Sequence, residues 1–518
     1  MPARKKSVPP PPPAAPLYDW LQRRAAGVLL HPTCLPGDQG CGVLDRHAVA
    51  FLDFLRAAGM KYWQVCPLGP TGYGDSPYQC FSAFAGNPYL VDLAALVEPG
   101  LLAASDLAGL AALPQDHVDY GALYHLKPAL LAAAHARFTA RPVPLPYGDF
   151  AAFCASQAGW LDDYAAFRAL KDHFAGAAWW DWPAEARDHR RAMKSALLRR
   201  LAAAIAGVKF GQYLFFGQWA RVRAAAHERG IELIGDLPIF VAADSADAWA
   251  HPELFELDPV TLRPVAVAGV PPDYFSADGQ LWGNPLYAWP AHAAEGYAWW
   301  LARLRASFAL CDVVRIDHFR GFDAYWRIPL PAQNARRGEW LPGPGLDLFR
   351  AFRAALPEAR IIAEDLGVLT DSVRQLRAAT GLPGMSVLQF AWGGDATNAY
   401  LPHEATANSV VYAGTHDNDT TLGWYRAATA AERDHVRRYL RVSGDDIAWD
   451  FIRVACASVA RLAILTLPDI LALGAEARFN TPSRAEGNWQ WRVRAADLEK
   501  ISGGTAAYLR ELTQLTGR

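Results

Sequence analysis

The sequence has little that would point to a metal, a redox centre or a membrane. Its seven cysteines are scattered, without a C-x-x-C pair or a cysteine–histidine spacing suited to a metal. An odd, unpatterned set of cysteines is typical of reduced thiols in a cytosolic protein, so we expect a cytoplasmic location. The best candidate for a membrane span, 454–473, is interrupted by Arg461, Pro468 and Asp469. We therefore expect no bound metal and no membrane partner.

An excess of charge is also lacking. The 50 Lys and Arg residues balance 52 Asp and Glu residues, for a net charge of -2, and the charges are dispersed. Such a distribution does not favour a nucleic-acid partner. The glycine-rich stretch 31–42 lacks the G-x-x-x-x-G-K-[ST] phosphate-binding pattern, so it predicts a turn.

The first residues do not have the pattern of a secretory signal. Residues 1–16 are basic and then proline-rich, with no apolar middle region. As a transit peptide the segment would be short and poor in serine. It predicts a disordered tail with polyproline II character, which ends near Pro16.

The rest of the chain, 17–518, has the pattern of alternating strands and helices. Its length allows several domains or one large barrel with insertions. Between 93 and 210, alanine, leucine and helical spacing dominate, which predicts a mainly helical insertion. Eight short apolar segments, each followed by a loop, surround Val28, Tyr62, Leu233, Val313, Ile361, Val387, Val410 and Ile464. This order predicts the α/β class and a (β/α)8 TIM barrel.

Acidic residues stand at the ends of four predicted strands. Arg315 and Asp317 lie two positions apart, so they share one face of a strand and should project together. A fixed arginine would keep Asp317 ionised with a low pKa, as a nucleophile requires. The alternative is a purely structural ion pair. Asp236, Glu364 and Asp417 also end predicted strands, and the ends of parallel strands meet at one barrel mouth.

Aromatic residues accompany these carboxylates. The chain has 19 tryptophans and 19 tyrosines, whose rings suit the apolar faces of sugars. Two polar-aromatic loops, 61–79 and about 268–290, are predicted to contact substrate; the alternative is that their aromatic residues only fix the loops to the protein. Carboxylates on both sides of a bond, together with aromatic residues, indicate chemistry on glycosidic bonds.

The chain resembles the 4-α-glucanotransferases known as amylomaltase or disproportionating enzyme, within the α-amylase-like glycoside hydrolases. The resemblance covers almost everything from Gly27 onward. Its matching stretches are Y-G-D-S-P-Y (73–78), G-D-L-P (235–238), P-D-Y-F-S (272–276), R-I-D-H-F (315–319), A-E-D-L-G (363–367), T-H-D-N (415–418) and G-N-W (487–489). The first and third of these are specific to the family.

The resemblance implies transfer of an α-1,4-glucan segment to the 4-hydroxyl of a glucose or maltooligosaccharide acceptor, by a retaining double displacement. Intramolecular transfer would give cyclic glucans. It implies Asp317 as nucleophile, Glu364 as general acid/base with a raised pKa, and Asp417 as transition-state stabiliser. No metal or organic cofactor is implied. The substrate-binding residues that we expect are Ser76, Tyr78, Asp236, Tyr274, Phe275, Trp282, Arg315, His318, His416 and Asn488.

Two alternatives remain open at this point. A hydrolase could use the same three carboxylates, because water competes with the acceptor sugar for the glycosyl-enzyme. A non-catalytic glucan-binding protein could use the aromatic loops alone, although the three carboxylates argue against it.

Overall fold

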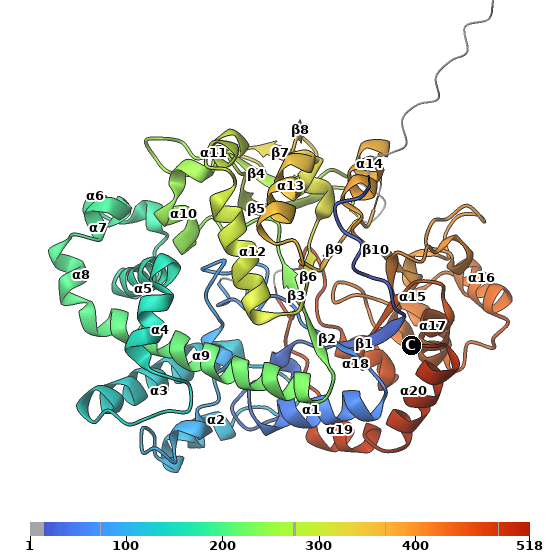
Figure 1. Ribbon diagram of the computed structural model, residues 1–518, viewed down its shortest axis with the longest axis horizontal. Coiled ribbons are helices and arrows are strands. Elements are labelled where there is room, and N and C mark those ends of the chain that lie inside the picture. The colour runs from blue at the N-terminus through green and yellow to red at the C-terminus, as the bar shows by residue number, and fades with distance from the viewer. Residues whose placement is uncertain (1–14, 73, 273–275, 368, 485) are drawn as a thin grey trace, which may run out of the picture.

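The computed structural model describes residues 15–72, 74–272, 276–367, 369–484 and 486–518. Its centre is a sheet of eight strands, which coincide with the eight predicted ones: β1 (Ala25–Leu29), β2 (Tyr62–Gln64), β3 (Glu232–Leu237), β6 (Val313–Ile316), β9 (Ile361–Ala363), β10 (Gly384–Val387), β11 (Ser409–Tyr412) and β12 (Leu462–Thr466). The strands pair in parallel in the order β10-β11-β12-β1-β2-β3-β6-β9. The predicted TIM barrel is confirmed (Figure 1).

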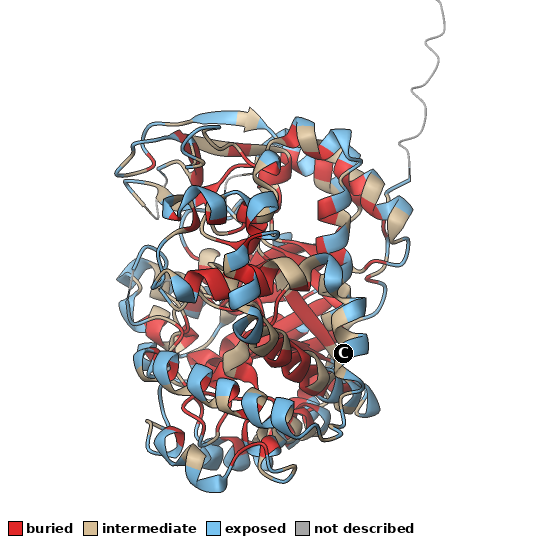
Figure 2. Ribbon diagram, turned by 90° about the vertical axis from the view of Figure 1, so that its left-hand side faces the viewer, coloured by how far each residue is buried: buried red, intermediate tan, exposed pale blue. Residues whose placement is uncertain are grey.

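The barrel is closed between its two end strands, β9 and β10. The N–H of Ala363 donates a hydrogen bond of 2.9 Å to the carbonyl oxygen of Pro383, which lies just before β10. Every residue of β1, β2, β6, β9, β10, β11 and β12 is buried. Strands buried on both faces read as continuous apolar runs, which is why the sequence revealed them. Figure 2 shows these buried strands wrapped by helices whose outer faces are exposed.

Helices cover the outside of the barrel. In α1 (Arg46–Ala57), Asp45 caps the first turn by accepting a hydrogen bond from the N–H of His47, and a stripe including Phe51 and Leu55 is buried. The other helices that flank the strands are α12 (Ala298–Leu310), α13 (Gly345–Ala355), α14 (Asp371–Thr380), α15 (Thr421–Ala427), α16 (Ala430–Leu440), α17 (Ile447–Ala457), α19 (Ala495–Ile501) and α20 (Gly504–Leu515).

The segment between β2 and β3 is largely helical. Its longer helices are α3 (Tyr120–Ala140), α4 (Phe150–Ser156), α5 (Ala158–His173) and α9 (Ala202–Glu228), with short helices between them. They lie to one side of the barrel (Figure 1). Helix α9 continues beyond residue 210 and leads directly to β3, so one helix belongs both to this region and to the barrel.

A second, antiparallel sheet lies above the barrel and was not predicted. Its strands, in the order β5-β4-β7-β8, are β5 (Gln280–Pro285), β4 (Ala266–Val270), β7 (Ala324–Pro329) and β8 (Glu339–Pro342). The expectation of one long loop over about 268–290 is therefore wrong: β4 and β5 form a hairpin, and Trp282 lies on β5. A register shift between Val267 and Gly269 breaks the alternation that would have indicated a strand. Tyr274 and Phe275 lie outside the described residues.

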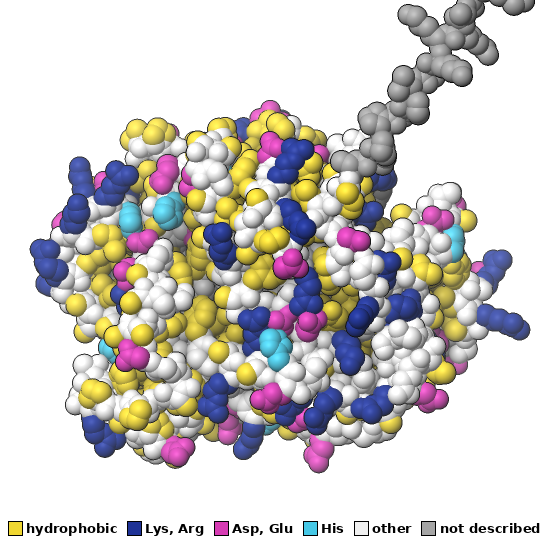
Figure 3. All heavy atoms as spheres, in the orientation of Figure 1, with side chains coloured by type: hydrophobic (Ala, Val, Ile, Leu, Met, Phe, Trp, Pro, Cys, Tyr) yellow, Lys and Arg dark blue, Asp and Glu magenta, His cyan; other side chains and the backbone are white. Residues whose placement is uncertain are grey.

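The surface carries charges of both signs. On the face shown in Figure 3, Lys and Arg side chains are interspersed with Asp and Glu side chains. Among the helices in the described part of the chain, none is both long and apolar enough to cross a membrane.

Two glycine substitutions test how tightly the barrel strands approach each other. At Gly27 on β1, an added Cβ would lie 2.6 Å from both the carbonyl oxygen and the Cβ of Tyr62 on β2. We expect Gly27→Ala to lower the free energy of unfolding by about 1–3 kcal/mol, because backbone atoms cannot move aside as a side chain can.

The matched control is Gly211→Ala within α9, where an added Cβ would meet nothing within 4 Å outside its own helix. It should stabilise the protein by about 0.5–1 kcal/mol, because glycine is unfavourable inside a helix. Thermal and urea unfolding measure both changes. Equal effects of the two substitutions would contradict the close approach of β1 and β2.

Candidate active site

Arg315 joins two carboxylates at the carboxyl ends of β3 and β6. Asp236 on β3 is the register partner of Arg315 on β6, and Asp317 follows β6 directly. One guanidinium nitrogen of Arg315 donates to both oxygens of Asp236, at 2.7 and 2.6 Å, and the other donates to Asp317 Oδ1 at 3.0 Å. The side chain of Asp236 is fully buried, whereas that of Asp317 is 26% exposed. The predicted pairing of Arg315 with Asp317 is confirmed.

The expectation of a low pKa for Asp317 is wrong. Burial raises the pKa of this carboxyl to about 6, although Arg315 lowers it. The negative charge of Asp236, which also accepts hydrogen bonds from Arg315, raises the pKa of Asp317 further. The sequence did not show that a single arginine is shared by two carboxylates.

Glu364 is held beside Asp317 by the main chain. It follows β9, the neighbour of β6, and its Oε2 and Oε1 accept hydrogen bonds from the N–H groups of His318 (2.6 Å) and Leu366 (3.1 Å). His318 has a left-handed backbone with φ of 49°, which is uncommon for a residue other than glycine. Burial, and then the negative charge of Asp317, raise the pKa of Glu364 to about 7. The predicted rise is confirmed, with burial as its larger cause.

Asp417 lies on a turn beyond β11. This strand ends at Tyr412 rather than at the predicted His416–Asp417, because Asn418 Oδ1 accepts hydrogen bonds of 2.9 Å from the N–H and the hydroxyl of Thr415 and closes a turn. Asp417 Oδ1 accepts a hydrogen bond of 2.6 Å from the side-chain amide of Asn480. Burial acts to raise the pKa of Asp417, but the adjacent His416 and the Asn480 amide hold it below its usual range.

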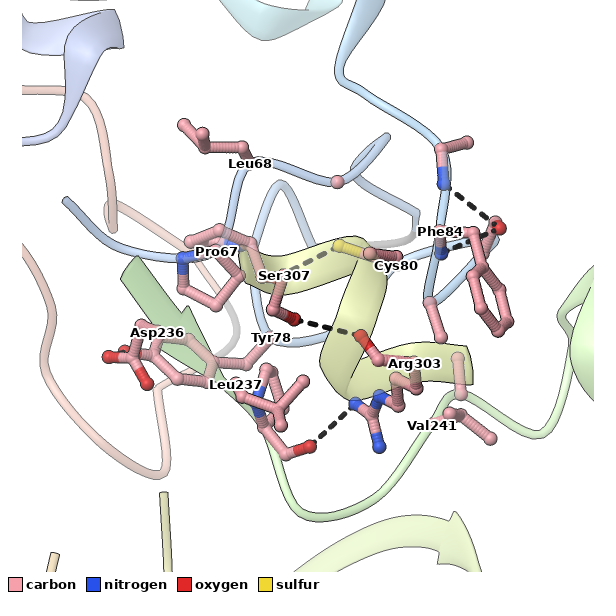
Figure 4. Close-up of a pocket in the computed structure, with 18 of the residues that line it drawn as sticks. Pro67, Leu68, Tyr78, Cys80, Phe84, Asp236, Leu237, Val241, Arg303 and Ser307 are labelled. Carbon is pink, nitrogen blue, oxygen red and sulfur yellow. Dashed lines mark hydrogen bonds between the residues drawn. The ribbon is translucent and has the colours of Figure 1, made fainter. Parts of the chain in front are cut away.

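Three aromatic rings form one wall of the site. The ring of His416 stacks on that of Tyr78, with centroids 5.1 Å apart, and the ring of Trp489 lies 5.8 Å from His416. The hydroxyl of Tyr78 donates to Asp236 Oδ2 at 2.7 Å, so the aromatic wall is tied to the pair of Asp236 and Arg315. Figure 4 shows the Tyr78 ring beside the Asp236 carboxylate at the edge of a pocket that α12 also lines.

Three other predicted residues lie near this wall or on its loops. The hydroxyl of Ser76 accepts a hydrogen bond from the N–H of Tyr78 at 3.2 Å, which shapes the turn that presents the ring. Trp282 packs edge-on against His318, with centroids 4.8 Å apart. The side chain of Asn488 bonds within its own loop, to the N–H of Thr481 at 2.8 Å and to the carbonyl oxygen of Arg484 at 2.9 Å.

Asn480 was missed by the sequence analysis. The stretch that contains it, 480–492, is polar and aromatic, but nothing in the sequence links it to Asp417. Within the residues that the structure describes, no group of three or more His, Cys, Asp or Glu side chains is arranged to hold a metal ion.

Carboxylates at the carboxyl ends of parallel barrel strands, with aromatic rings beside them, are typical of TIM-barrel enzymes that act on glycosidic bonds. The model of the 4-alpha-glucanotransferase family matches residues 30–498. The chain therefore belongs to the 4-alpha-glucanotransferase family of enzymes.

Individual relatives agree with this assignment. A 4-alpha-glucanotransferase from Thermus thermophilus is 49% identical over 499 residues, covering 95% of this chain and 99% of the relative. A chloroplastic/amyloplastic 4-alpha-glucanotransferase from Solanum tuberosum is 40% identical, covering 96% and 88%. The amylomaltase from Streptococcus agalactiae in complex with acarbose has a TM-score of 0.91 and 38% identity, covering 96% and 100%. The amylomaltase from Corynebacterium glutamicum, at 17% identity and a TM-score of 0.76, shares the fold.

The electrostatic link between Asp317 and Glu364 can be measured directly. Asp317→Asn removes the negative charge that raises the pKa of Glu364, so that pKa should fall below about 7 while burial keeps it above the usual value. NMR titration of 13C-labelled glutamate carboxyls reports the change. Asp434→Asn, on the exposed face of α16, is the control and should leave the Glu364 pKa unaltered. An unchanged or higher pKa in Asp317→Asn would contradict the link.

Proposed function

We propose that this enzyme transfers α-1,4-glucan segments by a retaining double displacement with Asp317 as nucleophile and Glu364 as general acid/base. The observation that carries the proposal is the arrangement on β6 and β9. The residue after Asp317 donates its N–H to the Glu364 carboxyl at 2.6 Å, so the two acids come from adjacent strand ends. Retaining enzymes need their two carboxyls only about 5–5.5 Å apart.

The raised pKa of Glu364 and the hydrogen bond from Arg315 to Asp317 support the proposed roles of general acid/base and nucleophile. With a pKa of about 7, Glu364 carries a proton near neutral pH that it can give to the glycosidic oxygen of the donor. Asp317 accepts a hydrogen bond from the Arg315 guanidinium, which favours its ionised form, and it attacks the anomeric carbon. The bond to the leaving glucan breaks and a glycosyl–Asp317 ester forms. Glu364 then takes the proton from the 4-hydroxyl of the acceptor, which attacks the same carbon and releases Asp317.

Asp417 is proposed to stabilise the transition state. Its low pKa keeps it ionised, so its oxygens accept hydrogen bonds from sugar hydroxyls. These bonds strengthen as the ring acquires positive charge in an oxocarbenium-like transition state.

The substrate contacts are proposed on the aromatic wall and around it. Among the described residues, His318 Nε2 and His416 Nδ1 are buried ring nitrogens without a hydrogen-bond partner. The His318 ring packs against Trp282 and the His416 ring stacks on Tyr78, so both rings are proposed to take part in the substrate contacts. Tyr78 and Trp282 would contact sugar faces, while Arg315, Asp236 and Ser76 fix the surrounding side chains. Asn488 is proposed to contact the substrate at the rim of the site, and Tyr274 and Phe275 are proposed to contact it on the acceptor side.

The partners proposed are maltooligosaccharides and α-1,4-glucans, in linear or intramolecular transfer, and neither nucleic acid nor membrane. Interspersed surface charges support the exclusion of nucleic acid (Figure 3). A cytoplasmic location is proposed because all seven cysteines lie in the described part of the chain as free thiols.

Incubation with maltotriose distinguishes transfer from hydrolysis. Transfer should give glucose and a ladder of longer oligomers, because the glycosyl-enzyme passes its sugars to another maltotriose. Chromatography of the products and a reducing-end assay give the ratio of the two reactions. Glu364→Gln is the control for contaminating activity. Production of only maltose and glucose, with a steady rise in reducing ends, would contradict transfer.

The roles of Asp317 and Glu364 can be separated with a glycosyl fluoride donor. Fluoride leaves with little need for protonation, so Glu364→Gln should still form the covalent intermediate and then accumulate it, because it lacks the base for the second step. Asp317→Asn should form none. Intact-mass spectrometry detects the added sugar, and peptide mapping locates it. An adduct on the Asp317→Asn protein, or on another carboxylate, would show that the nucleophile is assigned wrongly.

A further inference from the structure

We propose that Asn480 and Arg478 are positioning residues for Asp417, so that a segment after β12 sets the geometry of the transition-state stabiliser. The inference rests on the proposed role of Asp417. Neither residue was found from the sequence, and neither is one of the groups proposed above to touch the sugar.

Both residues bind Asp417, but at different atoms. The Asn480 amide donates to Asp417 Oδ1 at 2.6 Å, and Arg478 Nη2 donates to the main-chain carbonyl oxygen of Asp417 at 2.8 Å. Arg478 Nε also donates to the carbonyl oxygen of Asn480 at 2.6 Å. Arg478 therefore binds main-chain atoms of both Asp417 and Asn480, and the Asn480 amide fixes the Asp417 carboxylate.

The segment that carries them is tied to other parts of the chain by hydrogen bonds at Trp489. The N–H of Trp489 donates to the carbonyl oxygen of Phe479 at 2.6 Å, which closes the base of the loop next to Asn480. Trp489 has a left-handed backbone with φ of 61°, and its carbonyl oxygen accepts a hydrogen bond of 3.0 Å from the hydroxyl of Tyr120 on α3. A non-glycine residue keeps such a conformation only where its surroundings impose it.

Asp417 needs this support because its side chain is 46% exposed and its backbone lies on a turn beyond β11. A carboxylate stabilises a transition state only if it already points at the developing charge. An amide is well suited to hold it, because it fixes one oxygen without adding a charge and so leaves the negative charge of Asp417 available to the sugar. A lysine or arginine at position 480 would neutralise that charge.

Removing the amide should therefore lower turnover more than binding. We expect Asn480→Ala to reduce kcat about tenfold to a hundredfold, as for the loss of a hydrogen bond to a charged group, while KM stays within about twofold. The donor is maltotriose, with glucose release measured over time. The matched control is Asn408→Ala. Asn408 donates an amide hydrogen bond of 3.0 Å to Gly381 at the opposite end of β11, so its loss should leave kcat unchanged.

Asn480→Asp supplies a readout that a purely structural role would not move. At acidic pH the new carboxyl keeps a proton because it lies beside the Asp417 carboxylate, and its O–H can donate to Asp417 as the amide does. As pH rises it ionises and two carboxylates repel each other. The ratio of kcat in Asn480→Asp to kcat in Asn480→Ala should therefore be greatest at low pH and fall as pH increases.

Each result decides the inference once folding is checked by thermal unfolding. A kcat for Asn480→Ala within twofold of the wild type, or a pH-independent ratio between the two variants, would overturn it. Asp417→Ala, measured in parallel, separates it from the proposed function. If Asp417→Ala keeps full turnover, the proposed role of Asp417 fails. If it is inactive while Asn480→Ala is normal, only the positioning by Asn480 fails.

Discussion

The site depends on one buried cation. Arg315 is almost completely buried and binds Asp236 and Asp317 at once, and Tyr78 in turn donates to Asp236. Loss of either partner from a buried ion pair is costly, because it leaves an uncompensated charge in a medium of low polarity. The guanidinium therefore fixes Asp236 on β3 and Asp317 after β6, and through Asp236 it also fixes the ring of Tyr78. The position of Asp317, the proposed nucleophile, relative to the aromatic wall is a consequence of that arrangement.

The same cation helps to explain why the carboxyls of Asp317, Glu364 and Asp417 differ in pKa. One guanidinium faces Asp236 and Asp317 with Glu364 nearby, so positive charge is scarce there and burial raises the pKa of Asp317 and Glu364. Asp417 has further partners of its own in His416 and Asn480. The negative charge of Asp417 raises the pKa of His416 even though burial lowers it, and His416 in turn keeps Asp417 ionised. Burial and the available charged or hydrogen-bonding partners together, rather than residue type, set the protonation state of each carboxyl.

Much of the fold could be predicted from the sequence, and the reason is physical. Barrel strands are buried on both faces, so each appears as a short apolar run, and an acid directly after the run marks the mouth. Asp317 and Glu364 follow β6 and β9 without an intervening residue. The second sheet could not be found in this way, because the β4–β5 hairpin has a register shift and its strands alternate poorly. The pKa of Asp317 could not be predicted either, because it depends on burial and on an arginine that is shared across strands.

Asn480 shows where such prediction ends. It lies 63 residues from Asp417 in the chain, yet the two meet because β11 and β12 are neighbours and their following segments return to the same mouth. The position of a residue that directly follows a strand is set by the barrel. The position of a residue on a long loop is set by the conformation of that loop. The loop of Asn480 is closed by the hydrogen bond between Phe479 and Trp489, and no periodic sequence pattern predicts this contact. The chemistry of this site is therefore carried by short strand-end motifs, and its geometry is completed by contacts that only the folded chain brings together.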